Sequence, residues 1–377
     1  MSRPRILVVD DDAAHRRAVL RVLEAGCDVV AASGARDALE QAAAQRFDVA
    51  LLDIRMPGMD GFDLMGELKV ADPEIDVILM TGSVTDTDQR LSRAIREKAF
   101  FFLQKPFPRD VLLGLVGRCL ELRRLATEKR LRAAQMENEL AAARSFQGSL
   151  LPARVGEIGP LAIATLYESS REMGGDFFDW EPIGGPGVAV FVADVAGKGA
   201  AAAMLTGMVK QAWRSAAAEA FAPGVALQRV FATTRLFPDQ RHLTAFSGRI
   251  GADSESLEYI ITAGHPPAFV VRADGEVEMI DASAEVLHPA FPTWRFEQRV
   301  TSFARGDRLI VFTDGLLESS RAADGEMFGI ERVEEVLAAH PRRNAGEMVE
   351  ALRDALRSFQ DGRPADDDLA IVVVGRG

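Results

Sequence analysis

The stretch VLLGLVGRCLELRRLATEKRLRAAQMENELAAARSFQGSLL, residues 111–151, decides how the rest of the chain is organised. It lacks proline, is rich in Leu, Ala, Glu and Arg, and lies between Asp110, which can cap a helix, and Pro152. Apolar residues recur along it at alternating steps of four and three, the heptad spacing of coiled coils. The stretch therefore predicts one long helix that joins two domains. Its apolar seam, interrupted by the polar Lys129, comprises Leu115, Cys119, Leu122, Ala126, Ala133, Met136, Leu140 and Ala143.

This seam has two interpretations. It can pack against the chain's own domains, or it can pair with the same helix of a second copy. We expect the second, a homodimer through the linker helix. The small alanines and Lys129 in the seam indicate that such pairing would be marginal.

Bulk composition narrows the class of protein. A chain of 377 residues is long enough for two domains and a connector, and a formal charge of −12 argues against a nucleic-acid partner. Cys27 and Cys119 show no metal or redox spacing, which favours a reducing, cytoplasmic location. We expect no signal peptide, because Met1–Pro4 leads straight into the apolar run Ile6–Val9. We also expect no membrane association, because no apolar run is long enough to cross a bilayer.

Residues 1–120 alternate short apolar runs with amphipathic segments. That alternation is typical of an α/β domain with a doubly wound parallel sheet. In such a sheet, ligands bind where the carboxyl ends of neighbouring strands meet. The expected strands are 6–9, 29–32, 49–52, 77–80 and 100–103, with helices such as 13–24 and 35–44 between them.

Polar residues stand at these strand ends. Asp10 and Asp11 follow the first strand, Asp53 ends the third, Thr81 follows the fourth and Lys105 follows the fifth. Converging carboxylates repel one another unless a cation lies between them, and oxygen ligands suit Mg²⁺, which also bridges to phosphate. A carboxylate beside that ion can attack a phosphoryl group, and a lysine and a hydroxyl can then hold the product.

The motifs VVDDDAAHRR, LLDIRMPGMDG, LMTGS and FFLQKPF resemble those of the response-regulator receiver domain. The resemblance implies that a sensor histidine kinase phosphorylates Asp53. It also implies that Thr81 and Lys105 are switch residues, and it puts Phe102 where the family often has a tyrosine. The magnesium ligands that it implies are Asp10, Asp11, Asp53 and the backbone carbonyl of Arg55.

The rest of the chain groups strand-like runs with helical ones. This grouping predicts an α+β sandwich, with two sheets inside and helices outside. The expected strands are 162–166, 188–193, 243–248, 257–262, 268–271, 308–312 and 369–374, and the expected helices are 200–220, 225–236 and 347–358.

Four separate segments of this second part carry an aspartate, mostly beside glycines: Asp176, Asp194, Asp314 and Asp367. Glycine lets the backbone approach a metal ion or a phosphate closely. Because neither His nor Cys accompanies these acids, the expected site is an all-oxygen one for Mg²⁺ or Mn²⁺ rather than zinc. Two such ions can activate water in line with a phosphorus atom.

The motifs FQGSLLP, MGGDFFDW, DVAGKGAAAAML, TAGHPPAFV, FTDGLLES and DDLAIVVV resemble, in this order, the stage-II-sporulation-E/sigma-B-regulator branch of the PPM (type 2C) phosphatases. The resemblance implies an α-β-β-α sandwich that hydrolyses phosphoserine or phosphothreonine with two Mn²⁺ or Mg²⁺ ions. Ala370 and Thr262 replace the family's usual Thr and Asn. The register of 366–368 is ambiguous, and we choose its second aspartate. The matching positions are Asp176, Asp194, the carbonyl of Val195, Asp314 and Asp367.

Three further polar residues are candidates for substrate contacts. Lys198 could meet the substrate phosphate or be a solvated loop lysine. His265 could touch the substrate, but a structural role in its turn is the stronger interpretation. Arg171 could orient a phosphate.

Together the two resemblances imply a cytoplasmic two-component response regulator with a receiver at 1–120, a helical linker at 111–151 and a phosphatase domain at 152–377. Its expected substrate is a phosphorylated STAS-type anti-sigma-factor antagonist, and phosphorylation of Asp53 is expected to control the output. One alternative is a phospho-regulated binding scaffold with an inactive phosphatase fold. Another is a receiver that serves only for constitutive dimerisation.

Overall fold

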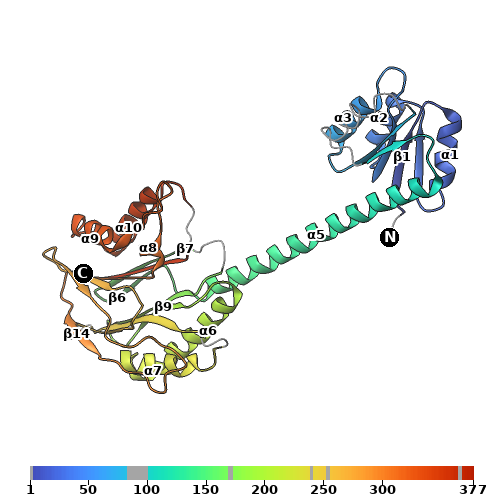
Figure 1. Ribbon diagram of the computed structural model, residues 1–377. Coiled ribbons are helices and arrows are strands. Elements are labelled where there is room, and N and C mark those ends of the chain that lie inside the picture. Colours follow the sequence, from blue (N-terminus) through green and yellow to red (C-terminus); the bar gives the residue numbers. More distant parts are fainter. Residues whose placement is uncertain (1–2, 83–100, 169–172, 238–240, 252–254, 364–366) are drawn as a thin grey trace. The chain divides into compact units, whose positions relative to one another are not determined.

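The computed structural model describes residues 3–82, 101–168, 173–237, 241–251, 255–363 and 367–377. The chain divides into two compact units, Met1–Asn138 and Glu139–Gly377, and each is described by itself (Figure 1). Within the described ranges, we find no helix with the length and apolar character that crossing a membrane would require.

The N-terminal unit is built on a five-stranded sheet in the order β2-β1-β3-β4-β5, with all neighbours parallel. This order reverses between β1 and β3, which creates the switch point at which such sheets bind ligands. The predicted doubly wound fold is confirmed. Its elements are β1 (Arg5–Val9), α1 (Ala13–Leu23), β2 (Asp28–Ala32), α2 (Ala35–Ala44), β3 (Val49–Asp53), α3 (Gly61–Ala71), β4 (Asp76–Thr81) and β5 (Phe101–Gln104).

Both faces of this sheet are covered. Successive side chains of a strand point to opposite faces, so Leu7 and Leu52 join one core cluster while Ile6 and Leu51 join the other. Burial on both faces explains why the central strands are continuous apolar runs in the sequence.

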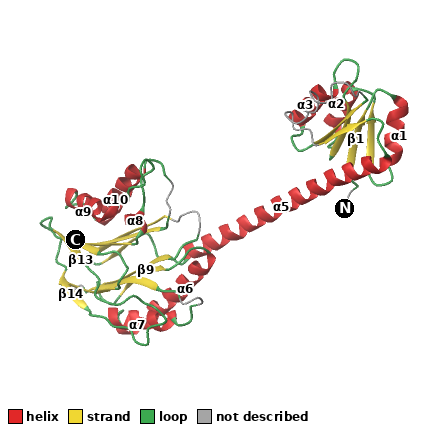
Figure 2. Ribbon diagram, in the orientation of Figure 1, coloured by secondary structure: helices red, strands yellow, loops and turns green. Residues whose placement is uncertain are grey.

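Helix α5 (Arg109–Ser149) is a single helix of 41 residues, as the opening stretch predicted (Figure 2). Its first turns belong to the N-terminal unit, where Val116 and Cys119 are buried against the sheet. Farther along, the seam residue Met136 is 64% exposed, and the seam residues Ala126 and Ala133 are also exposed. The seam therefore packs on its own domain at its start and is uncovered in its middle.

Arginines fasten α5 to the N-terminal unit beyond the buried turns. The Arg123 guanidinium lies 3.4 Å from the Asp48 carboxylate and also donates to the carbonyl oxygen of Glu74. About two turns later, the Arg130 guanidinium lies 2.6 Å from the Glu74 carboxylate. Such partly exposed ion pairs each stabilise a structure by about 0.2–1 kcal/mol, so they add only modestly to the packing of α5 on the N-terminal unit.

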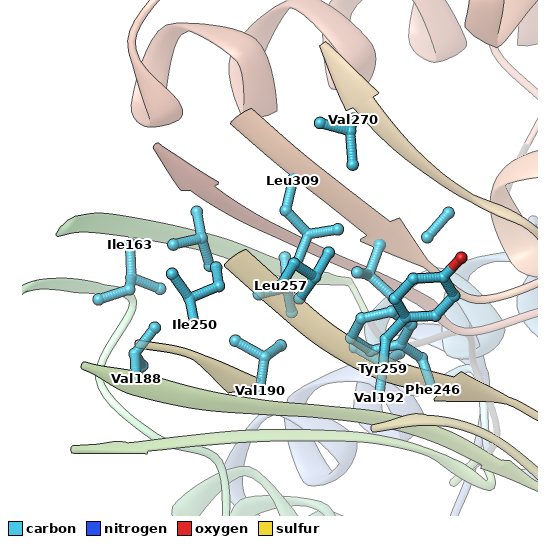
Figure 3. Packing of buried hydrophobic residues seen from close by; sticks show 14 of the residues in the cluster. Ile163, Val188, Val190, Val192, Phe246, Ile250, Leu257, Tyr259, Val270 and Leu309 are labelled. Carbon is cyan, nitrogen blue, oxygen red and sulfur yellow. The ribbon is translucent and has the colours of Figure 1, made fainter. Parts of the chain in front are cut away.

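The C-terminal unit consists of two antiparallel sheets, ordered β14-β11-β10-β9-β8 and β13-β12-β15-β16-β7-β6. Figure 3 shows the apolar side chains that fill the space between them, among them Val190, Phe246 and Leu309. Its strands are β6 (Val155–Ile158), β7 (Leu161–Glu168), β8 (Asp176–Pro182), β9 (Val188–Val195), β10 (Leu243–Ile250), β11 (Ser256–Ile261), β12 (Ala268–Val271), β13 (Val277–Ile280), β14 (Arg299–Ser302), β15 (Arg308–Phe312) and β16 (Leu369–Arg376).

Helices cover the outer faces of both sheets, which confirms the predicted sandwich (Figure 1). Helices α6 (Ala200–Arg214) and α7 (Pro223–Thr234), with the short 3₁₀ helix Ser215–Glu219, pack on the first sheet. Helices α8 (Gly315–Glu318), α9 (Gly329–Ala339) and α10 (Ala345–Gln360) cover the second. The sequence did not predict β6, β8, β13, β14, α8 and α9.

Candidate functional site

The first acidic site lies where β1 and β3 end. Carboxylate oxygens of Asp10, Asp11 and Asp53 all lie within 4.8 Å of one another. The Lys105 Nζ atom is 2.7 Å from Asp10 Oδ2 and 3.1 Å from Asp53 Oδ2. Burial raises the pKa of Asp53, while the adjacent Lys105 opposes that rise. The fold thus brings together four residues that the sequence placed at the ends of three different strands.

The other predicted residues of this unit lie around that group. Thr81 is buried at the end of β4, and its carbonyl oxygen accepts the Lys105 backbone N–H at 2.6 Å. Phe102 is partly buried on β5, against the core. Arg55 has an exposed side chain, and its backbone N–H bonds to the Asp53 carboxylate. Their positions suit a site centred on Asp53.

Two neighbouring residues of α1 contact Asp10, and sequence reasoning missed both. His15 Nδ1 lies 2.5 Å from Asp10 Oδ2, and the Arg16 guanidinium donates to the Asp10 backbone oxygen. The third aspartate of the run, Asp12, has a local role instead, because its side chain caps α1. The sequence feature that could have indicated these contacts is the pair His15 and Arg16 in the first turn of α1, which directly follows the aspartate run.

The second acidic site lies in the C-terminal unit. Asp176 opens β8 and is the cross-strand partner of Asp194 on β9, while Asp314 follows β15. Oxygens of these three carboxylates all lie within 4.8 Å of one another. Strand pairing and a nearby loop therefore gather acids that are far apart in the chain.

Burial and mutual repulsion dominate the electrostatics of this group. Burial, followed by the charge of Asp194, raises the pKa of Asp176 well above its usual range. Burial, followed by Asp314, raises the pKa of Asp194 to about 7. The pKa of Asp314 is also raised, chiefly by burial. A cation between the three would relieve this repulsion.

The backbone around the group fits a metal ion. A Cβ atom on Gly175 would lie 2.0 Å from the Val195 carbonyl oxygen and 2.9 Å from Asp194 Oδ1. On Gly174 it would lie 1.9 Å from Asp368 Oδ2. Only glycine leaves room for these oxygens, and an all-oxygen donor set suits Mg²⁺ or Mn²⁺. The residues present therefore fit the predicted ions.

Among the described residues, the Asp367 carboxylate is not part of the group within 4.8 Å. Its Oδ2 atom lies 2.9 Å from Lys198 Nζ, yet its charge raises the pKa of both Asp194 and Asp314. The next aspartate, Asp368, is buried and accepts a hydrogen bond of 2.8 Å from the Tyr167 hydroxyl. The first aspartate of the triple lies outside the described residues.

Thr313 is a further member of this site that sequence reasoning missed. Its hydroxyl donates to Asp176 Oδ2 at 2.5 Å and accepts the Ala370 backbone N–H at 3.0 Å. The motif FTDG could have indicated this role, because it places the Thr313 hydroxyl directly before the site residue Asp314. Ala370 itself is buried in the core between the sheets, and Thr262 accepts the Ala245 N–H at 2.8 Å. Both departures from the family pattern thus have structural roles.

His265 is buried in its turn, with Nδ1 2.9 Å from the Pro266 carbonyl oxygen. Burial lowers the pKa of this histidine to about 4. These contacts favour the structural interpretation of His265. Arg171 lies outside the described residues.

Comparisons with known proteins match the two parts of the chain to two families. The family described as "Response regulator receiver domain" matches residues 6–116. The family described as "Stage II sporulation protein E (SpoIIE)" matches residues 184–377, which is more than half of the chain.

Individual relatives match one part or the other. The C4-dicarboxylate transport transcriptional regulatory protein DctD of Pseudomonas aeruginosa is 41% identical over 132 residues, 34% of this chain and 28% of its own length. Protein IcfG of Synechocystis is 25% identical over 266 residues, 63% of this chain and 41% of its own length. The chain thus spans less than half the length of these curated relatives.

Among solved structures, the SiaA-PP2C domain of Pseudomonas aeruginosa matches with a TM-score of 0.56 and 22% identity, covering 65% of this chain and 98% of that one. This likeness supports the fold. The two family matches, over residues 184–377 and 6–116, show that the chain belongs to the stage II sporulation protein E (SpoIIE) family and carries a response regulator receiver domain ahead of the family's PP2C-type phosphatase domain.

Proposed function

We propose that the C-terminal domain hydrolyses phosphoserine or phosphothreonine on a protein, with two Mn²⁺ or Mg²⁺ ions. The observation that carries this proposal is the group of three carboxylates, one buried and two partly buried, with raised pKa values beside a glycine turn. When bound, such ions neutralise phosphate oxygens and activate water at neutral pH. The residues that would hold them are Asp176, Asp194, the carbonyl of Val195, Asp314 and Asp367.

The chain's own residues prepare this site in two ways. Thr313 donates to Asp176, which orients that carboxylate and favours its ionised form. Lys198 lies against Asp367, so a positive charge stands at the side of the site where Asp367 lies. A bound phosphate group would be attracted to that charge.

The N-terminal domain, we propose, accepts a phosphoryl group on Asp53 from a sensor histidine kinase. Three acids converge there, and Lys105 is placed to neutralise the phosphorylated side chain. Thr81 and Phe102 would respond to it. The magnesium ligands would be Asp10, Asp11, Asp53 and the carbonyl of Arg55.

Helix α5 would carry the regulation. We propose a receiver at 1–120, a linker at 111–151 and a phosphatase domain at 152–377, in a cytoplasmic homodimer paired through the exposed part of the seam. The exposure of the seam residues Ala133 and Met136 on an unbroken helix supports this pairing. The proposed substrate, a phosphorylated STAS-type anti-sigma-factor antagonist, rests on resemblance to the family.

Phosphate release from a phosphoserine protein tests the enzymatic proposal. The wild type should release phosphate only with Mn²⁺ or Mg²⁺, and Asp194→Ala should abolish the release. A wild type that releases none under any metal would instead favour the scaffold with an inactive fold.

Regulation needs its own test. Acetyl phosphate should change the phosphatase rate or the oligomeric state of the wild type and leave Asp53→Ala unaffected. If the two proteins behave alike, the receiver serves only for constitutive dimerisation.

A further inference from the structure

The last turns of α5 bury one polar side chain, that of Gln147. It is 7% exposed, whereas the preceding Phe146 is 68% exposed and Gly148 and Ser149 are also exposed. Burying an amide is unfavourable unless the group makes hydrogen bonds. Gln147 does so, because its Nε2 atom donates to the carbonyl oxygen of Gly174 at 2.9 Å.

Gly174 lies in the turn that leads into the metal site. The next residue, Gly175, accepts the Val195 N–H at 3.1 Å and lies too close to the Val195 carbonyl to carry a Cβ atom. The residue after that is Asp176. On the other side, Met173 accepts the Gly199 N–H at 2.6 Å. A shift of Gly174 would therefore move two of the proposed metal-binding groups.

A second set of contacts links the end of α5 to strand β8, which Asp176 opens. The Leu150 carbonyl oxygen accepts from Lys210 Nζ, which lies 2.9 Å from Asp179 Oδ2. Asp179 is fully buried on β8, three residues after Asp176, and also accepts a hydrogen bond of 2.7 Å from Arg214. The end of α5 therefore contacts the chain before Asp176, at Gly174, and is linked through Lys210 to the chain after it, at Asp179.

We infer that Gln147 is a positioning residue that ties the rotational setting of α5 to the metal affinity of the phosphatase site. Its amide holds the Gly174–Gly175 turn, which directly precedes Asp176 and lies against the Val195 carbonyl. Because the Gln147 side chain projects from the helix, a rotation of α5 about its axis would carry the amide away from the Gly174 carbonyl. The inference rests on the proposed metal site, and it adds the residue through which the linker acts on that site.

The test compares Mn²⁺ affinity, measured by calorimetry without substrate, between full-length variants. Gln147→Met keeps the length of the side chain and removes its donor. Gln135→Met makes the same change at an exposed position of the same helix and is the matched control. We expect Mn²⁺ binding about 10-fold weaker for Gln147→Met, since partners that orient metal-binding groups change affinity by about 10–100-fold, and unchanged binding for Gln135→Met.

Gln147→Asn serves as a second variant, because it keeps a polar amide but shortens its reach by one methylene. It should also weaken Mn²⁺ binding, and it carries the test if Gln147→Met does not fold. For both variants, saturating Mn²⁺ should restore most of the turnover, which a general folding defect would not allow.

Unchanged Mn²⁺ affinity in the folded Gln147 variants would overturn the inference. Its failure is separable from that of the proposed function. If the wild type binds Mn²⁺ but releases no phosphate from phosphoserine, and the Gln147 variants bind Mn²⁺ more weakly, then the proposed activity is wrong and the inference stands.

Discussion

The hydroxyl of Thr313 donates a hydrogen bond of 2.5 Å to Asp176, the most deeply buried of the three clustered carboxylates of the phosphatase site. This bond links the loop after β15 to the first residue of β8, and it opposes the rise in the pKa of Asp176 that burial causes. A side chain outside the set of acids thus helps to set the charge of the site.

Replacing Thr313 with valine should weaken Mn²⁺ binding by about 10-fold at neutral pH. The variant loses the donor that favours ionised Asp176, and it leaves the buried N–H of Ala370 without its partner, which costs about 1–3 kcal/mol. Thr313→Ser keeps the hydroxyl and should bind Mn²⁺ nearly as the wild type does. Calorimetric titrations of the three proteins check this, and equal affinities would contradict the role given to the hydroxyl.

The raised acid pKa values predict how the metal-free domain responds to pH. An acid with a higher pKa in the folded state binds more protons there than when unfolded, so stability falls as pH rises from the unfolded pKa to the folded one. For Asp194 this window runs from 3.8 to about 7. With a chelator present, the melting temperature of the C-terminal domain should therefore drop between pH 5 and pH 8, and Mn²⁺ should reverse the drop.

Asp194→Asn provides the control for that measurement. The amide carries no charge, so the metal-free variant should show a weaker pH dependence than the wild type and a higher melting temperature at pH 8. It should also gain little from Mn²⁺. A metal-free wild type that is equally stable at pH 5 and pH 8 would count against the raised pKa of Asp194.

Adding one methyl group to Gly175 should disable the site. The new Cβ atom would meet the Val195 carbonyl oxygen at 2.0 Å, so the backbone must shift. Because misplacement by about 1 Å can cost 100-fold in rate, we expect Gly175→Ala to lose roughly that much activity. Gly148→Ala on α5, where no atom lies within 4 Å of the added group, should stay active and gain up to about 1 kcal/mol in stability.

Lys129→Leu should tighten dimerisation, because it places an apolar residue at the one polar position of the heptad seam. Lys129 is exposed in the single chain, so the change should leave the monomer's fold intact. Sedimentation velocity would give the dimer affinity, with Lys129→Arg as the charge-preserving control. We expect the Leu variant also to respond less to acetyl phosphate, and an unchanged dimer affinity would argue against the seam.

Much of the fold could be predicted from the sequence because its central strands and its longest helix have simple patterns of apolar residues. The central strands β1, β3 and β9 are continuous apolar runs, and α5 has a long heptad pattern without proline. Strand β8 escaped prediction because it contains Asp176 and Asp179. Asp179 can be buried there only because Lys210 and Arg214 reach it from α6, and no local pattern reveals such partners.

The sequence motifs predicted which residues belong to the candidate sites, but not which side chains contact one another there. Motif order drew attention to Asp176, Asp194 and Asp314, which the fold brings together. It could not show that Lys198 would lie against Asp367. Nor could FQGSLLP reveal what Gln147 does, because its partner Gly174 becomes a neighbour only after folding.

The burial of Cys119 where α5 packs on the N-terminal sheet makes this thiol a natural reporter. It has no exposed surface, and burial raises its pKa to about 12, so neither the thiol nor the thiolate meets a reagent while the helix is docked. Its reaction rate therefore records how often the helix lifts from the sheet, with the half-buried Cys27 as an internal reference. Thiol labelling of the unmodified chain would therefore measure the rate at which the start of α5 separates from the N-terminal sheet.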